Sequence, residues 1–267
     1  MIRPVRLIPL LAVPIALLLG AGCGSNPTSP TPVTQGVADD VATQMASGVG
    51  SDNGGVTLEL KMFGAAFPTG PRPTRPQFRA TRSDTVITAG SITYAVSYTF
   101  YDADGVALDG WGPTAVRLLW NSRATGAVAT DRWSASLRRS STFNVNGIQN
   151  TQDTVVVDGT VRDTVQSQFM SLDGAHTRHL YSLGALTLSQ VAALKDTSVN
   201  RYPLSGTLAW SVHVQRLRSG RLGDVESTYD AEATVVFNGT RYPTVTVARV
   251  FHYVMDLNTG TVVRQPA

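Results

Sequence analysis

Three aspartates lie close together in the segment DADGVALDG, at Asp102, Asp104 and Asp109. Acidic residues at alternate positions begin a calcium-binding loop, which supplies about six to eight oxygen ligands and ends in a glutamate. Here the next alternate position is Val106, and no glutamate follows. Aspartate and glycine are also the residues that a tight turn requires. The segment therefore predicts a turn in preference to a metal site.

Two histidines, His176 and His179, lie three residues apart, and Asp173 precedes them. On a helix they would share a face and could bind a metal ion. On a strand the same spacing places them on opposite faces, and the surrounding pattern is that of turn and strand. The chain also has no phosphate-binding loop, nucleophile elbow or dinucleotide-binding motif. The sequence therefore predicts no catalytic residue, metal ion or cofactor, and it disfavours an enzyme without excluding one.

Residues 64–82, GAAFPTGPRPTRPQFRATR, combine four prolines and four arginines with no acidic residue. The arginines are Arg72, Arg75, Arg79 and Arg82. An arm of this kind could bind an anionic partner such as lipopolysaccharide or phospholipid headgroups. The preferred interpretation is a long irregular connection whose prolines reduce the entropy of the unfolded chain. The four arginines remain candidate contacts to an anionic partner.

The N-terminus combines positive charge, an apolar run and small residues. Arg3 and Arg6 precede the apolar residues 7–19, which are too few to span a membrane but sufficient for a signal-peptide core. The string LGAGC at 19–23 then ends in Cys23, the only cysteine of the chain. It resembles the lipobox of bacterial lipoprotein precursors. Gly20 stands where that family usually has leucine, so cleavage of an ordinary signal peptide with an unmodified thiol is the alternative.

The resemblance implies cleavage before Cys23, diacylglycerol on its sulfur and usually an acyl chain on the new amine. Two or more acyl chains give stable membrane anchoring. Because Gly24 and not aspartate follows the cysteine, the resemblance implies export to the periplasmic face or the surface of the outer membrane. Acylation would leave no thiol for a disulfide or a cysteine metal site.

The charge balance excludes one class of partner. The chain has 22 basic and 19 acidic residues, and removal of Arg3 and Arg6 with the signal leaves 22 − 2 = 20 basic residues. A general nucleic-acid binder carries a strongly basic face. We therefore expect no nucleic-acid partner, and we expect the membrane, an envelope protein or a lipid instead.

The sequence divides into four segments. We expect a signal peptide at 1–22, a flexible Pro/Ser/Thr tether at 23–36, a short helix and turn at 37–55, and a single antiparallel β domain at 56–267, with two packed β domains as the alternative. The helix is predicted from apolar residues at every fourth position, Val37, Val41 and Met45.

Apolar and polar residues alternate strictly in four stretches, which predicts half-buried antiparallel strands. These stretches are 56–62, 92–100, 208–214 and 225–237. Asp-Gly and Asn-Gly signals predict turns at 102–105, 157–160, 237–240 and 257–260. The segment TLSQVAALKD at 187–196 is predicted to be a short helix, and Arg216, Arg218 and Arg221 to flank a solvated hairpin tip. The predicted class is all-β: a mainly antiparallel meander forming a sandwich, open barrel or large curved sheet, with one or two short helices.

Three functions remain possible from the sequence. The preferred one is a structural or interaction module of the cell envelope. The second is a carrier of a lipid or other hydrophobic ligand, with aromatic side chains lining its pocket, although the same side chains would equally fill a closed core. These aromatic residues are Tyr94, Tyr98, Trp120, Trp133 and Trp210. The third is a hydrolase whose catalytic residues the sequence does not reveal.

Overall fold

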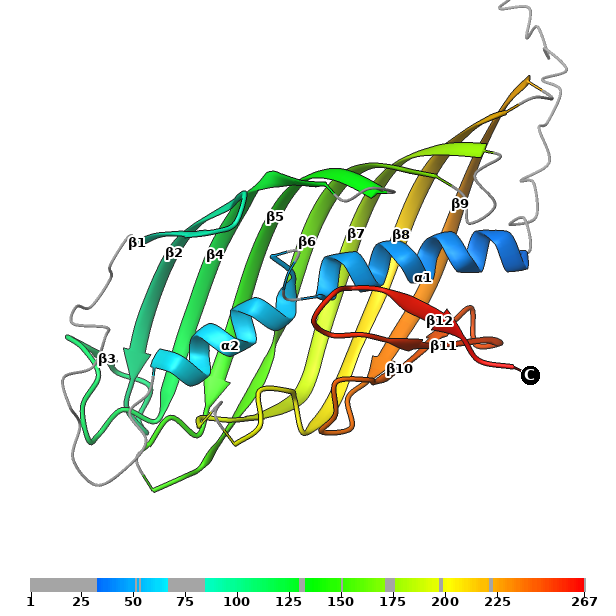
Figure 1. Ribbon diagram of the computed structural model, residues 1–267. Coiled ribbons are helices and arrows are strands. Elements are labelled where there is room, and N and C mark those ends of the chain that lie inside the picture. Colours follow the sequence, from blue (N-terminus) through cyan, green and yellow to red (C-terminus); the bar gives the residue numbers. More distant parts are fainter. Residues whose placement is uncertain are drawn as a thin grey trace, which may run out of the picture. The chain divides into compact units, whose positions relative to one another are not determined.

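The structure, a computed structural model, describes residues 33–266 with gaps at 51, 53, 67–84, 130–132, 150, 171–175, 197–198 and 221–222. All of them belong to one compact unit, Pro32–Ala267. Its main element is a large antiparallel sheet in which each strand pairs with its neighbour along the chain, except that β2 pairs with both β3 and β4 (Figure 1). The twelve described strands are β1 Thr85–Ala89, β2 Ile92–Tyr101, β3 Ala107–Leu108, β4 Arg117–Ala129, β5 Trp133–Asn146, β6 Thr154–Met170, β7 His176–Leu194, β8 Ser205–Gly220, β9 Gly223–Val236, β10 Thr244–Val247, β11 Phe251–Met255 and β12 Val262–Arg264.

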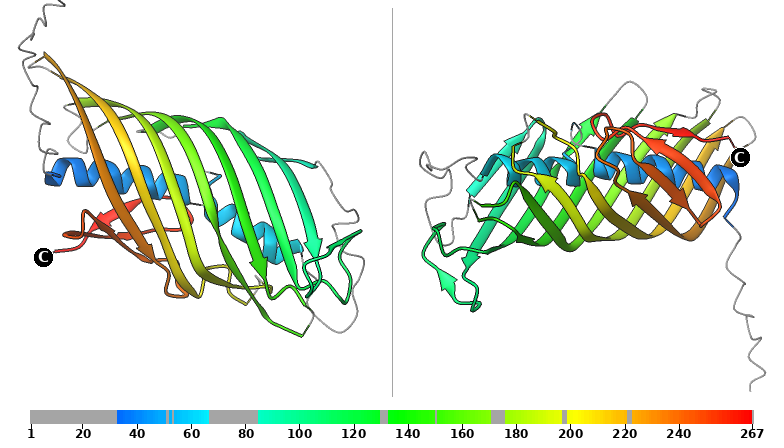
Figure 2. Two further views of the ribbon diagram at one scale, coloured as in Figure 1. Left: turned by 180° about the vertical axis from the view of Figure 1, so that it is seen from behind. Right: turned by 90° about the horizontal axis from the view of Figure 1, so that it is seen from below.

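This arrangement confirms the predicted fold class. The sheet is an antiparallel meander that does not close on itself, and it curves around two short helices (Figure 2). The helices are α1, Gln35–Val49, and α2, Val56–Ala66. Both lie on the same side of the sheet, which we call the inner face; the opposite side is the outer face.

Helix α1 is buried on two sides. The large sheet covers one side, and strands β10 to β12 cover the other (Figure 2). The side chain of Thr34 accepts a hydrogen bond from the amide of Val37 and so caps the first turn. At the other end the amide of Gly50 donates to the carbonyl of Ala46. The helix expected from residue 37 is therefore confirmed, and it begins at Gln35.

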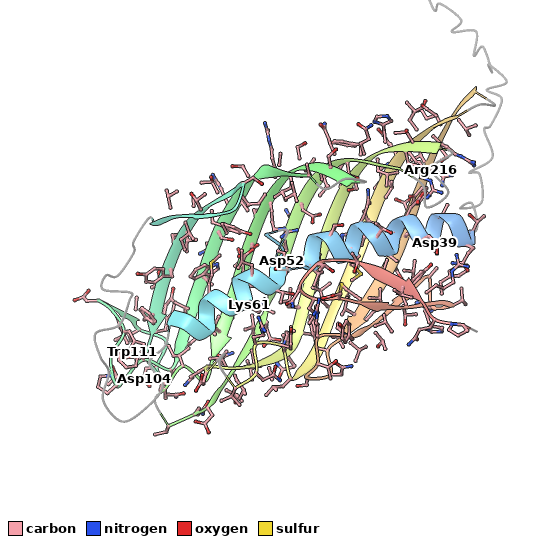
Figure 3. The ribbon with its side chains drawn as sticks, viewed as in Figure 1. Asp39, Asp52, Lys61, Asp104, Trp111 and Arg216 are labelled. Atoms are coloured by element: carbon pink, nitrogen blue, oxygen red, sulfur yellow. The ribbon has the colours of Figure 1, made fainter. Side chains whose placement is uncertain are left out.

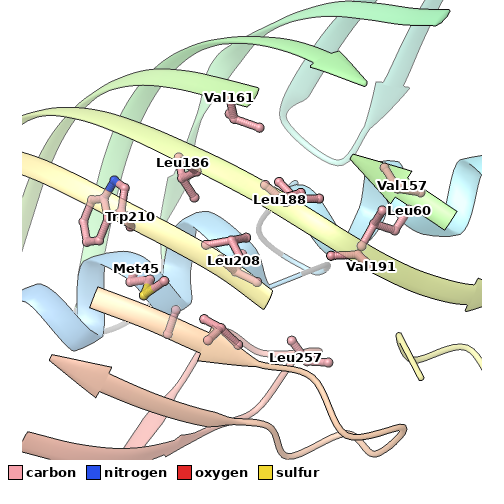
Figure 4. Packing of buried hydrophobic residues seen from close by; sticks show 14 of the residues in the cluster. Met45, Leu60, Val157, Val161, Leu186, Leu188, Val191, Leu208, Trp210 and Leu257 are labelled. Atoms are coloured by element: carbon pink, nitrogen blue, oxygen red, sulfur yellow. The ribbon is translucent and has the colours of Figure 1, made fainter. Parts of the chain in front are cut away.

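The core lies between the inner face and the helices. Met45 of α1 packs among the inner side chains of the sheet, near Leu208 and Trp210 (Figure 4). Four of the five aromatic residues singled out from the sequence are buried there: Tyr94, Tyr98, Trp120 and Trp210. The side chain of Trp133 lies outside the described residues. These four side chains fill the core, as the closed-core alternative predicted.

The strand predicted at 56–62 is wrong, because this segment forms helix α2. Its apolar residues alternate in the sequence, but two of the three polar residues between them are buried as completely. Thr57 and Glu59 have no exposed surface, like Val56. Glu59 is tolerated in the core because sheet side chains donate hydrogen bonds to it.

The helix predicted at 187–196 is also wrong, because it is part of β7. A β-bulge at Gln190, whose φ is 52°, interrupts the alternation, so the buried residues Leu188 and Val191 lie three positions apart. The turn predicted at 157–160 is also wrong, because β6 continues through these residues, which lie opposite the bulge in β7. There the Asp158 carboxylate accepts hydrogen bonds from the backbone and side-chain amides of Gln190.

The remaining turn predictions are confirmed. Residues 102–105 connect β2 to β3, residues 237–240 connect β9 to β10, and residues 257–260 connect β11 to β12. Strands β8 and β9 form the predicted hairpin, in which Gly220 pairs with Gly223. Among the described residues, neither helix is long and apolar enough to cross a membrane.

Candidate functional site

The structure tests only some of the residues that the sequence singled out. Cys23 and the four arginines of the Pro/Arg segment lie outside the described residues; these arginines are Arg72, Arg75, Arg79 and Arg82. The Asp102 carboxylate accepts hydrogen bonds from the amides of Asp104, at 3.0 Å, and Val106, at 2.8 Å, so it serves a turn. His176 and His179 both lie in β7, and the side chain of His179 is exposed, whereas that of His176 lies outside the described residues. Within the described ranges, no group of three or more acidic, histidine or cysteine residues could hold a metal ion.

The most deeply buried carboxylate is that of Glu59, in the first turn of α2. It accepts hydrogen bonds from the Ser122 hydroxyl at 2.7 Å, the Ser141 hydroxyl at 3.0 Å and the Trp120 indole at 3.3 Å. Burial raises the pKa of Glu59, while these hydrogen bonds and the charge of Arg139 oppose the rise. Because its oxygens already have partners on β4 and β5, Glu59 fixes α2 to the sheet and is not a catalytic acid.

Arg139 connects the two helices to the sheet. Its guanidinium group donates to the carbonyl of Gly48 at 2.9 Å and to that of Gly54 at 3.3 Å. It also lies 3.4 Å from the carboxylate of Asp163, and both side chains are almost completely buried. Burial raises the pKa of Asp163, and the positive charge of Arg139 lowers it. Arg139 therefore holds the end of α1, the connection to α2 and strand β6 together.

A second set of charges holds the first half of α1. The fully buried Asp40 carboxylate forms ion pairs with Arg178 on β7 and Arg216 on β8. Asp39 accepts hydrogen bonds from the Tyr253 hydroxyl at 2.8 Å and from Arg264 at 2.6 Å (Figure 3). The prediction that Arg216 belongs to a solvated hairpin tip is therefore wrong. It reaches the inner face because its position on β8 alternates with the outward-facing residues.

Arg218 and Arg221 were predicted, with Arg216, to flank the solvated hairpin tip. Arg218 is exposed, as predicted, and Arg221 lies outside the described residues. The His179 side chain is exposed on the outer face. The charged side chains named above on the inner face all have partners within the protein. The outer face is therefore the better candidate for a binding surface.

The outer face carries two open grooves. One, of about 650 Å³, has Gln166, His179, Tyr181 and Gln215 in its lining. The other, of about 730 Å³, includes His213 and Asp230 in its lining, together with three outward-facing arginines and hydroxyl side chains on β4, β5 and β6. These arginine and hydroxyl residues are Arg123, Thr125, Arg138, Ser140, Arg162 and Thr164, which we call the arginine grid. Figure 2 shows that neither described helix covers this side of the sheet.

The facing of the arginine grid follows from strand alternation. Ser122 and Ser141 bind Glu59 on the inner face, and Arg139 binds the helix connection there. Their sequence neighbours Arg123, Arg138 and Ser140 must therefore point outward. Exposure agrees, since all three arginines of the grid are exposed. The grid therefore places three arginines on three successive strands of the outer face.

Comparisons of the chain with protein-family models, curated proteins and solved structures found no match. The arginine grid could not be recognised from the sequence, because its three arginines come from three separate strands. Outward positions could be inferred for each strand from alternation, but their adjacency depends on the register between strands. The sequence reading also missed Arg139 and Asp163, since a buried charge becomes plausible only when its partner is known.

Proposed function

We propose that this protein is a membrane-anchored lipoprotein of the cell envelope that acts as a structural or interaction module through its outer sheet face. The observation that carries the proposal is that the inner face of the sheet is covered and the outer face is exposed. The inner face packs against the chain's own helices, whereas the outer face exposes a broad surface whose three grid arginines form no ion pair with another described residue. A surface of this kind is available to a partner without any rearrangement of the fold.

The carrier alternative receives less support. A ligand on the inner face would have to replace α1 and α2, which bury apolar side chains and are held by Arg139 and Asp40. The aromatic residues that could have lined a pocket are part of that core. Carriage of a hydrophobic ligand remains a prediction, and it requires the helices to leave the sheet.

Membrane anchoring is tested by mass spectrometry of the full chain produced in a bacterium. We expect the mature protein to begin at Cys23 and to carry the added mass of a diacylglycerol and a further acyl chain. A Cys23→Ser variant should lose this mass and leave the membrane fraction. A mature chain with an unmodified Cys23, or one that begins at another residue, would contradict the anchoring proposal.

The interaction role is tested by photo-crosslinking in intact cells. A benzophenone amino acid at the outer-face position Gln166 should give adducts with envelope proteins or lipids. The same group at Val199, an exposed residue with 73% of its surface accessible, serves as the matched control. Adducts of equal yield at both positions would show random collision and would count against the outer face as an interaction surface.

A further inference from the structure

We propose that the arginine grid binds the phosphate headgroups of anionic membrane lipids, so that the outer face of the sheet lies on the membrane. The choice of a membrane as the partner rests on the proposed anchoring through Cys23. The binding chemistry itself rests on the described residues alone: three guanidinium groups, three hydroxyl groups and the register that places them together.

The strand register arranges the six residues of the grid in two rows. In the first row Arg123 pairs with Ser140, which pairs with Arg162. In the second row Thr125 pairs with Arg138, which pairs with Thr164. Each arginine thus has hydroxyl residues beside it on the neighbouring strand.

The spacing suits a layer of phosphate groups. Neighbouring strands lie about 4.8 Å apart, so the backbones at the two ends of the first row are about 10 Å apart. Arg138 lies diagonally between these ends, about 7–8 Å from each. Guanidinium groups bind phosphate oxygens by paired hydrogen bonds, and the hydroxyl groups between them can donate further bonds. Three exposed arginines over this span can contact more than one phosphate.

Among the residues that the structure describes, no acidic side chain forms an ion pair with the grid, although Asp230 lines the far side of the same groove. The hydrogen bonds, ion pairs and ring contacts of the described residues involve none of its three guanidinium groups. In the two rows the nearest acids are Asp230 and Glu232 on β9, three strands beyond β6 and roughly 15 Å away. Asp230 also lies 2.7 Å from His213. Like charges at this spacing repel one another, and an anionic surface would relieve that repulsion.

Because the groove is open, a membrane surface with many phosphate groups suits it better than a single soluble phosphate ion. The grid lies on the face of a sheet, without the enclosing walls that bury most of a small ligand. Leu183 follows Thr164 in the second row and is 47% exposed, which adds an apolar side chain beside the charges. Only residues 24–34 separate Cys23 from α1, and they can span at most about 40 Å. Anchoring would therefore keep the grid at high effective concentration near the headgroups.

The test uses the mature chain from residue 23 with Cys23→Ser, which retains every described contact because the described residues begin at 33. Its sedimentation is measured with vesicles of phosphatidylglycerol and phosphatidylcholine in equal parts, and with vesicles of phosphatidylcholine alone, at low salt. The variant R123Q/R138Q/R162Q is compared with the control R201Q/R218Q/R249Q, which removes the same three charges at exposed positions elsewhere. Circular dichroism verifies that both variants fold.

Each arginine near an anionic surface strengthens binding by roughly fivefold, so we expect the grid variant to bind anionic vesicles about 100-fold more weakly. The control variant should lose less than about tenfold, and neither should bind phosphatidylcholine alone. If the triple variant does not fold, R138Q alone should still weaken binding roughly fivefold.

Equal losses in the grid and control variants would overturn the proposal, because net charge alone would then explain binding. Failure of the unsubstituted chain to bind anionic vesicles would also overturn it. Titration with inorganic phosphate, followed by calorimetry, would then identify a soluble phosphate site or exclude phosphate altogether. Because the tested chain carries no lipid, failure to bind anionic vesicles would leave the anchoring proposal intact. An unmodified Cys23 would contradict the anchoring proposal but would leave the affinity of the grid for phosphate unaffected.

Discussion

Replacing Arg139 with methionine tests the network that holds both helices on the inner face. The substitution keeps most of the side-chain volume but removes the ion pair with Asp163 and the hydrogen bonds to the carbonyls of Gly48 and Gly54. Breaking a buried ion pair from one side leaves the other charge uncompensated, which costs about 3–5 kcal/mol. We expect the free energy of unfolding to fall by that amount at pH 8.

The loss should depend on pH in a defined direction. Burial raises the pKa of Asp163 and of Glu59, and Arg139 lowers both. A raised carboxyl pKa contributes stability that is complete below the unfolded-state value and is lost as the pH rises through the folded-state value. Without Arg139 both folded-state values rise further, so ionisation costs more. The R139M variant should therefore lose less stability at pH 5 than at pH 8.

The measurement is urea unfolding followed by tryptophan fluorescence at both pH values, since Trp120 and Trp210 are buried in the core. A second substitution, Asp163→Asn, should recover about 1–3 kcal/mol in the R139M background, because it removes the unpaired charge. Asp163→Asn in the unsubstituted chain completes the cycle. The reasoning would be refuted if R139M cost less than 1 kcal/mol, or if its cost were the same at pH 5 and pH 8.

Two further predictions concern the interior. A methyl group at Gly184 would lie 2.3 Å from the Trp210 indole nitrogen and 2.6 Å from an Asp163 carboxylate oxygen, so Gly184→Ala should cost about 1–3 kcal/mol in urea unfolding. Gly110→Ala, with nothing within 4 Å of the added carbon, should cost much less, and equal costs would contradict this packing. Burial lowers the pKa of Lys195 from 10.5 to about 8, so the unfolded chain holds this proton more tightly. Stability should therefore rise with pH above about 8, and Lys195→Met should remove this part of the rise; an unchanged slope would contradict the assignment.

Strand alternation predicted most of the sheet because one face packs against the core and the other meets solvent. Ile92–Tyr101 illustrates this, since its residues alternate between buried and more exposed along the whole strand. The same signal failed at α2 because alternation in residue type is not alternation in burial. Glu59 occupies a position that the pattern assigned to solvent, and its partners lie more than 60 residues away in the chain. A local pattern cannot reveal such partners.

The β-bulge in β7 accounts for the helix that was wrongly predicted at 187–196, and it lies opposite the turn that was wrongly predicted in β6. At Gln190 one extra residue changes which face the following side chains occupy, so a strand acquires the three-residue spacing of a helix. Asp158 and Gly159 have the composition of a hairpin turn, yet β6 continues through them. A methyl group at Gly159 would lie 2.2 Å from the Thr142 carbonyl, so this glycine serves the close approach of two strands. Glycine serves both tight turns and the close approach of two backbones, so its presence alone does not distinguish them.

The arginine grid shows why the surface was harder to predict than the core. A core residue is recognised by its own type, whereas a surface site is recognised by what lies beside it. The sequence analysis looked for positive charge along the chain and found it in residues 64–82. The sheet gathers charge across the chain instead, from Arg123, Arg138 and Arg162 on three successive strands. The inner-face contacts of Ser122, Arg139 and Ser141 determine that the grid faces outward. If these strands were shifted by one residue, the grid would be buried and the network that holds the helices would be exposed.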